Sequence, residues 1–139
     1  MTDVDVVARF CTATQAGDVN AVMDTLASDA ELISPLAGRS AFRGHDDLRA
    51  LFSALLPALS GSTWRHRVRE ANTAVVVADA RVLGVRVGDA MLIECGRDGR
   101  IQRLTPHVRP WLGLTSLAVA LGPKLLRHPA LICRAFRPH

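Results

Sequence analysis

The sequence predicts an α+β fold in which three N-terminal helices pack against a curved antiparallel sheet, followed by a basic amphipathic helical extension. Three observations indicate this order. Apolar residues first recur at helical spacing, and from Trp64 onward they alternate with charged residues, which is typical of strands. A separate apolar stretch follows Pro110. With 139 residues, 49% of them hydrophobic, the chain is long enough for one domain with its own core.

Local start and stop signals divide the first part of the chain into helices. Gly17 is expected to end the first helix, because glycine readily takes the left-handed conformation found at helix ends, and Asp18 is expected to cap the second. Asp46 or Asp47 is expected to cap the third helix. Pro57 should end that helix, since proline cannot continue the hydrogen-bond pattern.

The first long strand is expected around Trp64. Trp64, His66 and Val68 alternate with three arginines, so the strand should have one apolar and one charged face. This pattern places His66 on the apolar face.

Further strands follow in a meander. Residues 73–87 are rich in valine and alanine and are expected to form one long strand, bent at Gly84. Gly88-Asp89 is expected to be a hairpin turn. Two more strands, joined by a turn at residues 97–99, are expected over residues 90–95 and 101–108.

Charge is distributed unevenly along the chain. Residues 1–98 hold all 13 acidic residues, whereas residues 99–139 hold seven basic residues and no acidic one. Residues 110–139 add leucines interrupted by glycine and proline, so two short amphipathic helices are expected there. We expect this extension to pack on its own domain. Contact with an anionic membrane surface, or with a protein partner, is the alternative.

Three stretches resemble the nuclear transport factor 2-like superfamily in its SnoaL-like branch: QAGDVNAVMDTLASDAELISP, FRGHDDLRALFSAL and GRDGRIQRL. The likeness extends from Val4 to about Val108. It implies a cone-shaped domain over residues 1–109, a conical cavity between sheet and helices, and a homodimer. The superfamily includes steroid isomerases, epoxide hydrolases, polyketide cyclases and non-catalytic binding domains, so the resemblance alone selects no activity.

The catalytic residues of the steroid isomerases do not carry over. Those enzymes need a carboxylate base before a proline, with a tyrosine and a protonated aspartate as donors to the oxyanion. The matching positions hold Ser34, Phe10 and Met91, and the chain contains no tyrosine. That form of the chemistry is therefore excluded.

Two other sets of residues are candidates for catalysis. The epoxide hydrolases of this superfamily use an Asp–Arg–Asp set on neighbouring strands. Here Asp79 and Arg81 retain one element of that set, in reversed order, and the carboxylate expected on the last strand falls near Pro106. Asp79 and Arg81 are two residues apart and so share one face of a strand. His66 is a candidate general base because its reference pKa lies near neutrality.

Three functions stay open. The first is binding of a small, largely hydrophobic molecule in the cone. The second is an isomerase, cyclase or hydrolase that transfers protons through His66, with Asp79 and Arg81 orienting the substrate. The third is a membrane or protein-docking module that uses residues 110–139. For the ligand-binding residues we expect Phe10, Phe52, Trp64, Met91, Leu104 and Trp111.

Several other properties are expected to be absent. Cys11, Cys95 and Cys133 lack metal-ligand spacing, and no glycine-rich phosphate-binding motif is present, so we expect no metal and no cofactor. The arginines of residues 65–69 lack enough aromatic neighbours for nucleic-acid binding. The acidic N-terminus contains no hydrophobic signal segment, and we expect a cytoplasmic protein.

Overall fold

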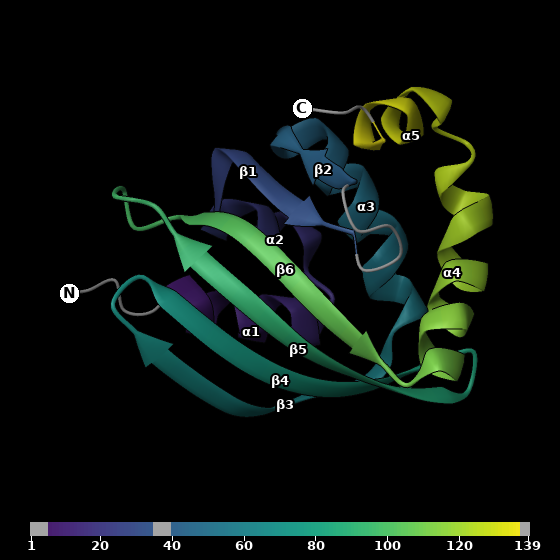
Figure 1. Ribbon diagram of the computed structural model, residues 1–139, viewed down its shortest axis with the longest axis horizontal. Helices are drawn as coiled ribbons and strands as arrows, with labels where there is room; N and C mark the ends of the chain where they lie inside the picture. Colours follow the sequence, from purple (N-terminus) through teal and green to yellow (C-terminus); the bar gives the residue numbers. More distant parts are fainter. Residues whose placement is uncertain (1–5, 35–39, 137–139) are drawn as a thin grey trace.

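The computed structural model describes residues 6–34 and 40–136 and confirms the α+β class, with helices on one side of a curved, open sheet (Figure 1). The helices are α1 (Val6–Ala16), α2 (Val19–Thr25), α3 (Gly44–Ala58), α4 (Trp111–Leu125) and α5 (Pro129–Ala135). The strands are β1 (Leu26–Ile33), β2 (Ala41–Arg43), β3 (Ser60–Glu70), β4 (Thr73–Val82), β5 (Val85–Cys95) and β6 (Ile101–Arg109).

The six strands lie in the order β2-β1-β6-β5-β4-β3. Neighbouring strands pair antiparallel with one exception, the parallel pair β1 and β6, in which Leu32 lies opposite Leu104. The sheet is therefore antiparallel, as predicted, except at this one pair. A parallel pair requires a long crossover, and here the connection from β1 to β6 contains α3 and the β3–β5 meander.

The predicted boundary between the first two helices is confirmed. Gly17 follows the last residue of α1 with a φ of +73°, and the side chain of Asp18 accepts a hydrogen bond of 3.1 Å from the backbone N–H of Ala21. These two residues act locally, which is why sequence alone could locate them.

The predicted cap of the third helix is wrong. α3 begins at Gly44, and Arg43 precedes it without a side-chain capping bond. Asp47 is only 7% exposed and binds Arg134 of α5 through two hydrogen bonds, of 2.9 Å and 2.5 Å. Its carboxylate therefore joins the C-terminal extension to α3 across 87 residues of sequence.

The hairpin turn between β4 and β5 also lies elsewhere than predicted. Val82 pairs with Val85, so the two-residue turn is Leu83-Gly84, and both turn residues have positive φ, +52° and +78°. A type I′ turn requires this conformation, but leucine is rarely found in it, so the sequence signal was weak. As a consequence, Asp89 lies within β5 and not in a turn.

A register shift in β3 reverses the predicted faces of that strand. Trp64 pairs with Ala78, but His66 pairs with Val77 because the register shifts between Trp64 and His66. The side chains beyond this bulge therefore change sides, and Arg67 lies opposite the buried Val76. His66 is exposed, so the expectation that it lies on the apolar face is wrong.

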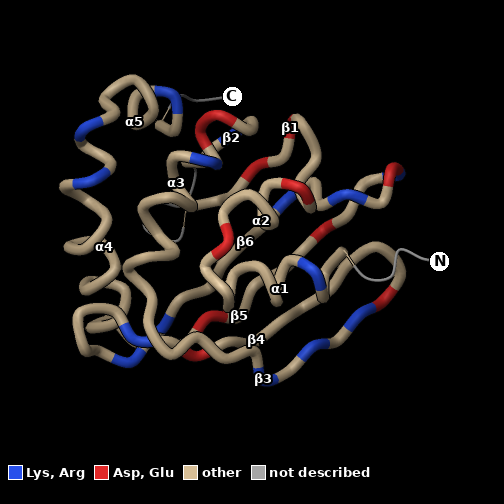
Figure 2. The backbone as a smooth tube through the Cα atoms, turned by 180° about the vertical axis from the view of Figure 1, so that it is seen from behind, with Lys and Arg blue, Asp and Glu red and all other residues tan. Residues whose placement is uncertain are grey.

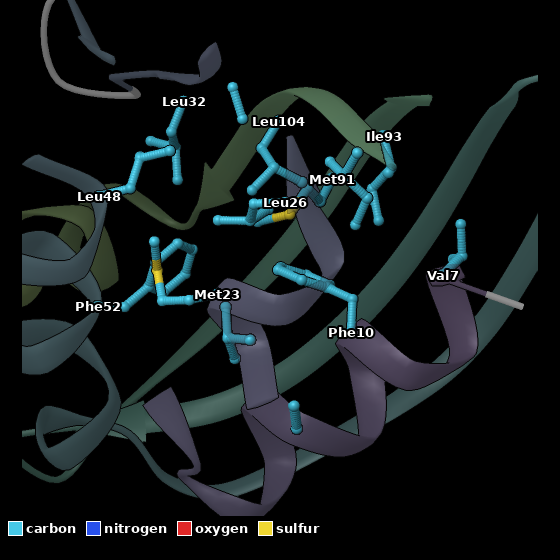
Figure 3. Close-up of a cluster of buried hydrophobic side chains, with 14 of the residues drawn as sticks. Val7, Phe10, Met23, Leu26, Leu32, Leu48, Phe52, Met91, Ile93 and Leu104 are labelled. Atoms are coloured by element: carbon cyan, nitrogen blue, oxygen red, sulfur yellow. The ribbon is translucent and has the colours of Figure 1, made fainter. Parts of the chain in front are cut away.

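The main core lies between the sheet and the first three helices. Phe10 of α1 and Phe52 of α3 meet edge to face with their ring centroids 6.2 Å apart, and both are 1% exposed. Figure 3 shows Met91 and Ile93 of β5 on the sheet side of the same cluster. This cluster fixes α1 and α3 against the sheet, because buried aromatic and aliphatic side chains dominate core energetics.

The extension forms two helices, as predicted. α4 packs on α3 and across β4, β5 and β6, and α5 contacts β2 (Figure 1). Figure 2 shows basic positions and no acidic one along both helices. Among residues 6–34 and 40–136, no helix has the length and apolar character needed to cross a membrane.

α4 approaches β5 closely at a glycine. A Cβ atom on Gly113 would overlap Cγ1 of Val87 and lie 3.0 Å from the carbonyl oxygen of Arg86. Gly122, on the same helix, has no such neighbour within 4 Å. The absence of a side chain at residue 113 thus permits this packing distance.

We predict opposite effects for Gly113→Ala and Gly122→Ala. Alanine favours a helix by about 1 kcal/mol over glycine, so Gly122→Ala should raise the free energy of unfolding by up to that amount. In Gly113→Ala the overlap with β5 should outweigh this gain, for a net loss of roughly 1–3 kcal/mol. Urea unfolding of both variants checks this, and equal stabilisation of the two would show that α4 does not contact β5 as described.

Candidate functional site

An apolar cavity of about 200 Å³ lies between the concave face of the sheet, α3 and α4. Its walls are mostly aliphatic and aromatic side chains, among them Leu51 and Leu55 of α3, Val87 of β5, and Leu117 and Leu121 of α4. An apolar cavity of about 150 Å³ is enough to hold a benzene-sized molecule. The space therefore has the size and chemistry for a small ring compound.

Four of the six predicted ligand-binding residues border this cavity, namely Phe10, Phe52, Trp64 and Met91. Leu104 is 1% exposed and belongs to the core, outside the cavity lining. Trp111 is 75% exposed and lies at the start of α4, also outside the lining.

The structure does not bring the three predicted catalytic residues into one site. His66 borders a second, more open groove of about 560 Å³ between α1 and β3. Asp79 borders the apolar cavity, but its carboxylate forms an ion pair with Arg65. Arg81 is exposed and donates a hydrogen bond of 3.4 Å to the carbonyl oxygen of Gly84.

Asp89 is the titratable residue that sequence reasoning missed. It lies in β5 between Ala78 of β4 and Val108 of β6, and all three residues border the apolar cavity. The side chain is half-buried, and its Oδ1 accepts a hydrogen bond of 3.1 Å from the backbone N–H of His107. The apolar residues on the same face of β5, Val87 and Met91, were the available signal, but the turn assigned to Gly88-Asp89 obscured it.

Burial raises the pKa of Asp89 from 3.8 to about 6, because removing a carboxylate from water disfavours its charged form. The hydrogen bond from the His107 backbone and the nearby His107 side chain lower the pKa and offset part of this effect. A carboxyl group with a pKa near 6 exchanges protons readily at neutral pH, which suits a general acid or base.

Hydroxyl groups complete the polar part of the lining. Ser34, at the position where the resemblance would place a carboxylate base, borders the cavity, as does Ser62. Thr14 also borders it, and its Oγ1 accepts a hydrogen bond of 3.1 Å from the indole N–H of Trp64. Within the described residues, no group of three His, Cys, Asp or Glu side chains is arranged to hold a metal ion.

Comparison with protein families shows where the chain belongs. The model of the SnoaL-like domain matches residues 7–104. The chain belongs to the SnoaL-like family. A search of curated proteins found no match.

Solved structures share the SnoaL-like fold over most of the chain. An uncharacterised bacterial protein with a cystatin-like fold from Silicibacter pomeroyi DSS-3 has 18% identity and a TM-score of 0.85, covering 94% of this chain and 92% of its own. A steroid delta-isomerase from Pseudomonas aeruginosa has 22% identity and a TM-score of 0.81, covering 92% and 94%. SalBIII, an epoxide hydrolase/cyclase-like enzyme of pyran ring formation in salinomycin, has 18% identity and a TM-score of 0.64, covering 78% and 95%. At these identities the likeness shows the fold alone.

We predict that Asp89→Asn stabilises the protein at neutral pH. The folded state holds the Asp89 proton more tightly than the unfolded state does. Protonated Asp89 therefore contributes its full stability to the fold below pH 3.8, and this stability is lost as pH rises through about 6. The amide carries no charge to desolvate and keeps an oxygen acceptor for the His107 N–H. Asp89→Asn should therefore gain up to roughly 3 kcal/mol at about pH 7 and little at about pH 4.

Urea unfolding at both pH values measures this difference. Asp98→Asn, in the exposed turn before β6, is the control and should show no comparable pH-dependent gain. A stability difference for Asp89→Asn that did not change with pH would contradict the raised pKa.

Proposed function

We propose that this SnoaL-like protein binds a small, largely apolar molecule in the cavity and transfers a proton on that molecule through Asp89. The observation that carries the proposal is one carboxyl group, with a pKa raised to about 6, in a wall otherwise formed mostly by apolar side chains. A carboxylate placed in apolar surroundings costs stability, and such groups occur preferentially at functional sites.

The composition of the walls selects the class of ligand. Leucine, phenylalanine and valine side chains surround most of the space, so a ligand gains free energy by leaving water, while a charged ligand would lose its hydration. The hydroxyl group of Ser62 offers a donor to an oxygen on the ligand. A ring compound with one carbonyl or hydroxyl group matches both features.

Asp89 would act on such a ligand as a general base. The ionised carboxylate accepts a proton from a carbon next to the carbonyl group and returns it to the same or a neighbouring atom, which exchanges or moves the proton without net oxidation or reduction. The apolar walls exclude water and strengthen electrostatic interactions at the reacting atoms. Proteins that share this fold include one named as a steroid delta-isomerase and one named as an epoxide hydrolase/cyclase-like enzyme, which is compatible with an enzyme built on this fold.

Ligand binding can be followed through Trp64, one of only two tryptophans in the chain. Trp111→Phe leaves Trp64, at the cavity wall, as the single fluorescent indole. We predict that bicyclic ketones change its emission with saturation. Ala118→Leu, which adds volume to the cavity wall, should weaken binding at least about tenfold by overfilling the site.

Thr115→Leu is the matched control, because Thr115 is exposed on the same helix. It should bind as the parent does. If Ala118→Leu and Thr115→Leu bind equally well, the ligand does not occupy this cavity.

Proton transfer is tested by deuterium exchange at the carbon next to the ketone, followed by mass spectrometry. We predict that the exchange rate rises with pH through about 6 and falls about 100-fold or more in Asp89→Asn, since one acid–base group typically contributes that much. Asp79→Asn, which removes the other described carboxylate of the lining, should retain exchange. Unchanged exchange in Asp89→Asn, with ligand binding intact, would leave a binding protein in which Asp89 transfers no proton.

A further inference from the structure

The outward side of α4 exposes large apolar side chains. Trp111, Leu112 and Val119 of α4 are 75%, 59% and 60% exposed, and Leu126, directly after the helix, is 69% exposed. We name these four residues the α4 outer face. They lie on one side of the helix. Val119 is eight residues and Leu126 fifteen residues after Trp111, each close to a whole number of turns, and Leu112 is adjacent to Trp111. Exposed apolar residues gathered in this way are typical of an interaction surface.

The opposite side of α4 is already occupied. Leu117, Leu121 and Leu125 point to the cavity and the core, and Gly113 is buried against β5. α4 thus cannot rotate to bury its outer face without exposing these residues. The outer face needs a partner outside the described part of the chain if it is to leave water.

The charges at the C-terminal end of α4 have a single sign. Lys124 and Arg127 are exposed at the C-terminal end of α4, and the sequence has no acidic residue after Asp98 (Figure 2). Arg134 is already paired with Asp47, but neither Lys124 nor Arg127 forms an ion pair with a described residue. The α4 outer face is therefore apolar, and it ends beside positive charges that no described acidic residue neutralises.

We propose that the α4 outer face docks on the surface of an anionic lipid bilayer. Lys124 and Arg127 would meet lipid phosphates, while Trp111 and Leu112 enter the boundary between headgroups and acyl chains, where tryptophan is favoured. This inference does not depend on Asp89 or on any ligand in the cavity.

A second copy of the chain fits this surface less well. A two-fold symmetric interface brings the same patch of both subunits together. An interface made of two such extensions would bring no acidic residue to Lys124 and Arg127. An anionic bilayer supplies both the apolar volume and the opposite charge.

The proposal is tested by sedimentation of the full chain with vesicles. Vesicles of phosphatidylcholine and phosphatidylglycerol in equal parts should bind the protein, and vesicles of phosphatidylcholine alone should bind it much less. Val119→Ser should weaken binding by about tenfold through lost apolar contact. Lys124→Gln with Arg127→Gln should weaken it roughly fivefold for each charge removed.

Val68→Ser is the matched control, because Val68 is 68% exposed on β3, away from α4. It should bind vesicles as the parent chain does. Circular dichroism checks that the variants fold, and the charge variant alters only exposed side chains, so it tests the proposal even if Val119→Ser unfolds.

Three results would overturn the proposal. One is a folded parent chain that does not sediment with anionic vesicles. Another is equal binding by the charge variant and Val68→Ser. The third is a dimer in analytical ultracentrifugation that Val119→Ser dissociates, without vesicle binding, which would assign the α4 outer face to self-association.

Discussion

The arrangement depends on covering the concave face of an open, curved sheet. α1 to α3 cover part of it with the cluster around Phe10 and Phe52, and α4 covers the remaining part at the end where β4 turns into β5. That contact is close because Gly113 has no side chain to hold the helix away from Val87. The ion pair between Asp47 and Arg134 fixes the following helix to α3. The cavity is the space that remains between α3, α4 and the sheet once these contacts are made.

At Asp89 the stability of the fold and the chemistry of the candidate site require different residues. A strand that faces an apolar cavity is most stable with apolar residues at every inward position, as at Val87, Met91 and Ile93. Asp89 breaks this series, and the backbone N–H of His107 compensates for only part of the lost hydration. A residue that violates the local pattern without full compensation is expected where function, and not folding, determines its identity.

The sequence allowed the class of fold, the three N-terminal helices and the two helices of the extension to be predicted, because these depend on short-range periodicity and on local residues such as Gly17 and Asp18. The two main errors in the sheet have a different origin. The Leu83-Gly84 turn places a leucine at positive φ, a residue type that gives no turn signal, and the bulge between Trp64 and His66 is determined by the pairing of β3 with β4. Each error moved one candidate residue: His66 was placed inside and is exposed, and Asp89 was placed in a turn and borders the cavity.

α4 links the two surfaces on which the proposals rest. Its inner residues, among them Leu117 and Leu121, form a wall of the cavity, and its outer residues expose apolar area to the surroundings. A helix that is apolar on both sides is normally buried on both sides, and here only one side is buried by the described chain. If a bilayer covers the other side, only α4 separates the cavity from the bilayer, in which small apolar molecules dissolve better than in water. Association with that phase would then raise the local concentration of ligand without any change at Asp89. Docking and ligand binding can therefore be separated by substitutions on opposite sides of α4, and proton transfer by substitution of Asp89 in β5.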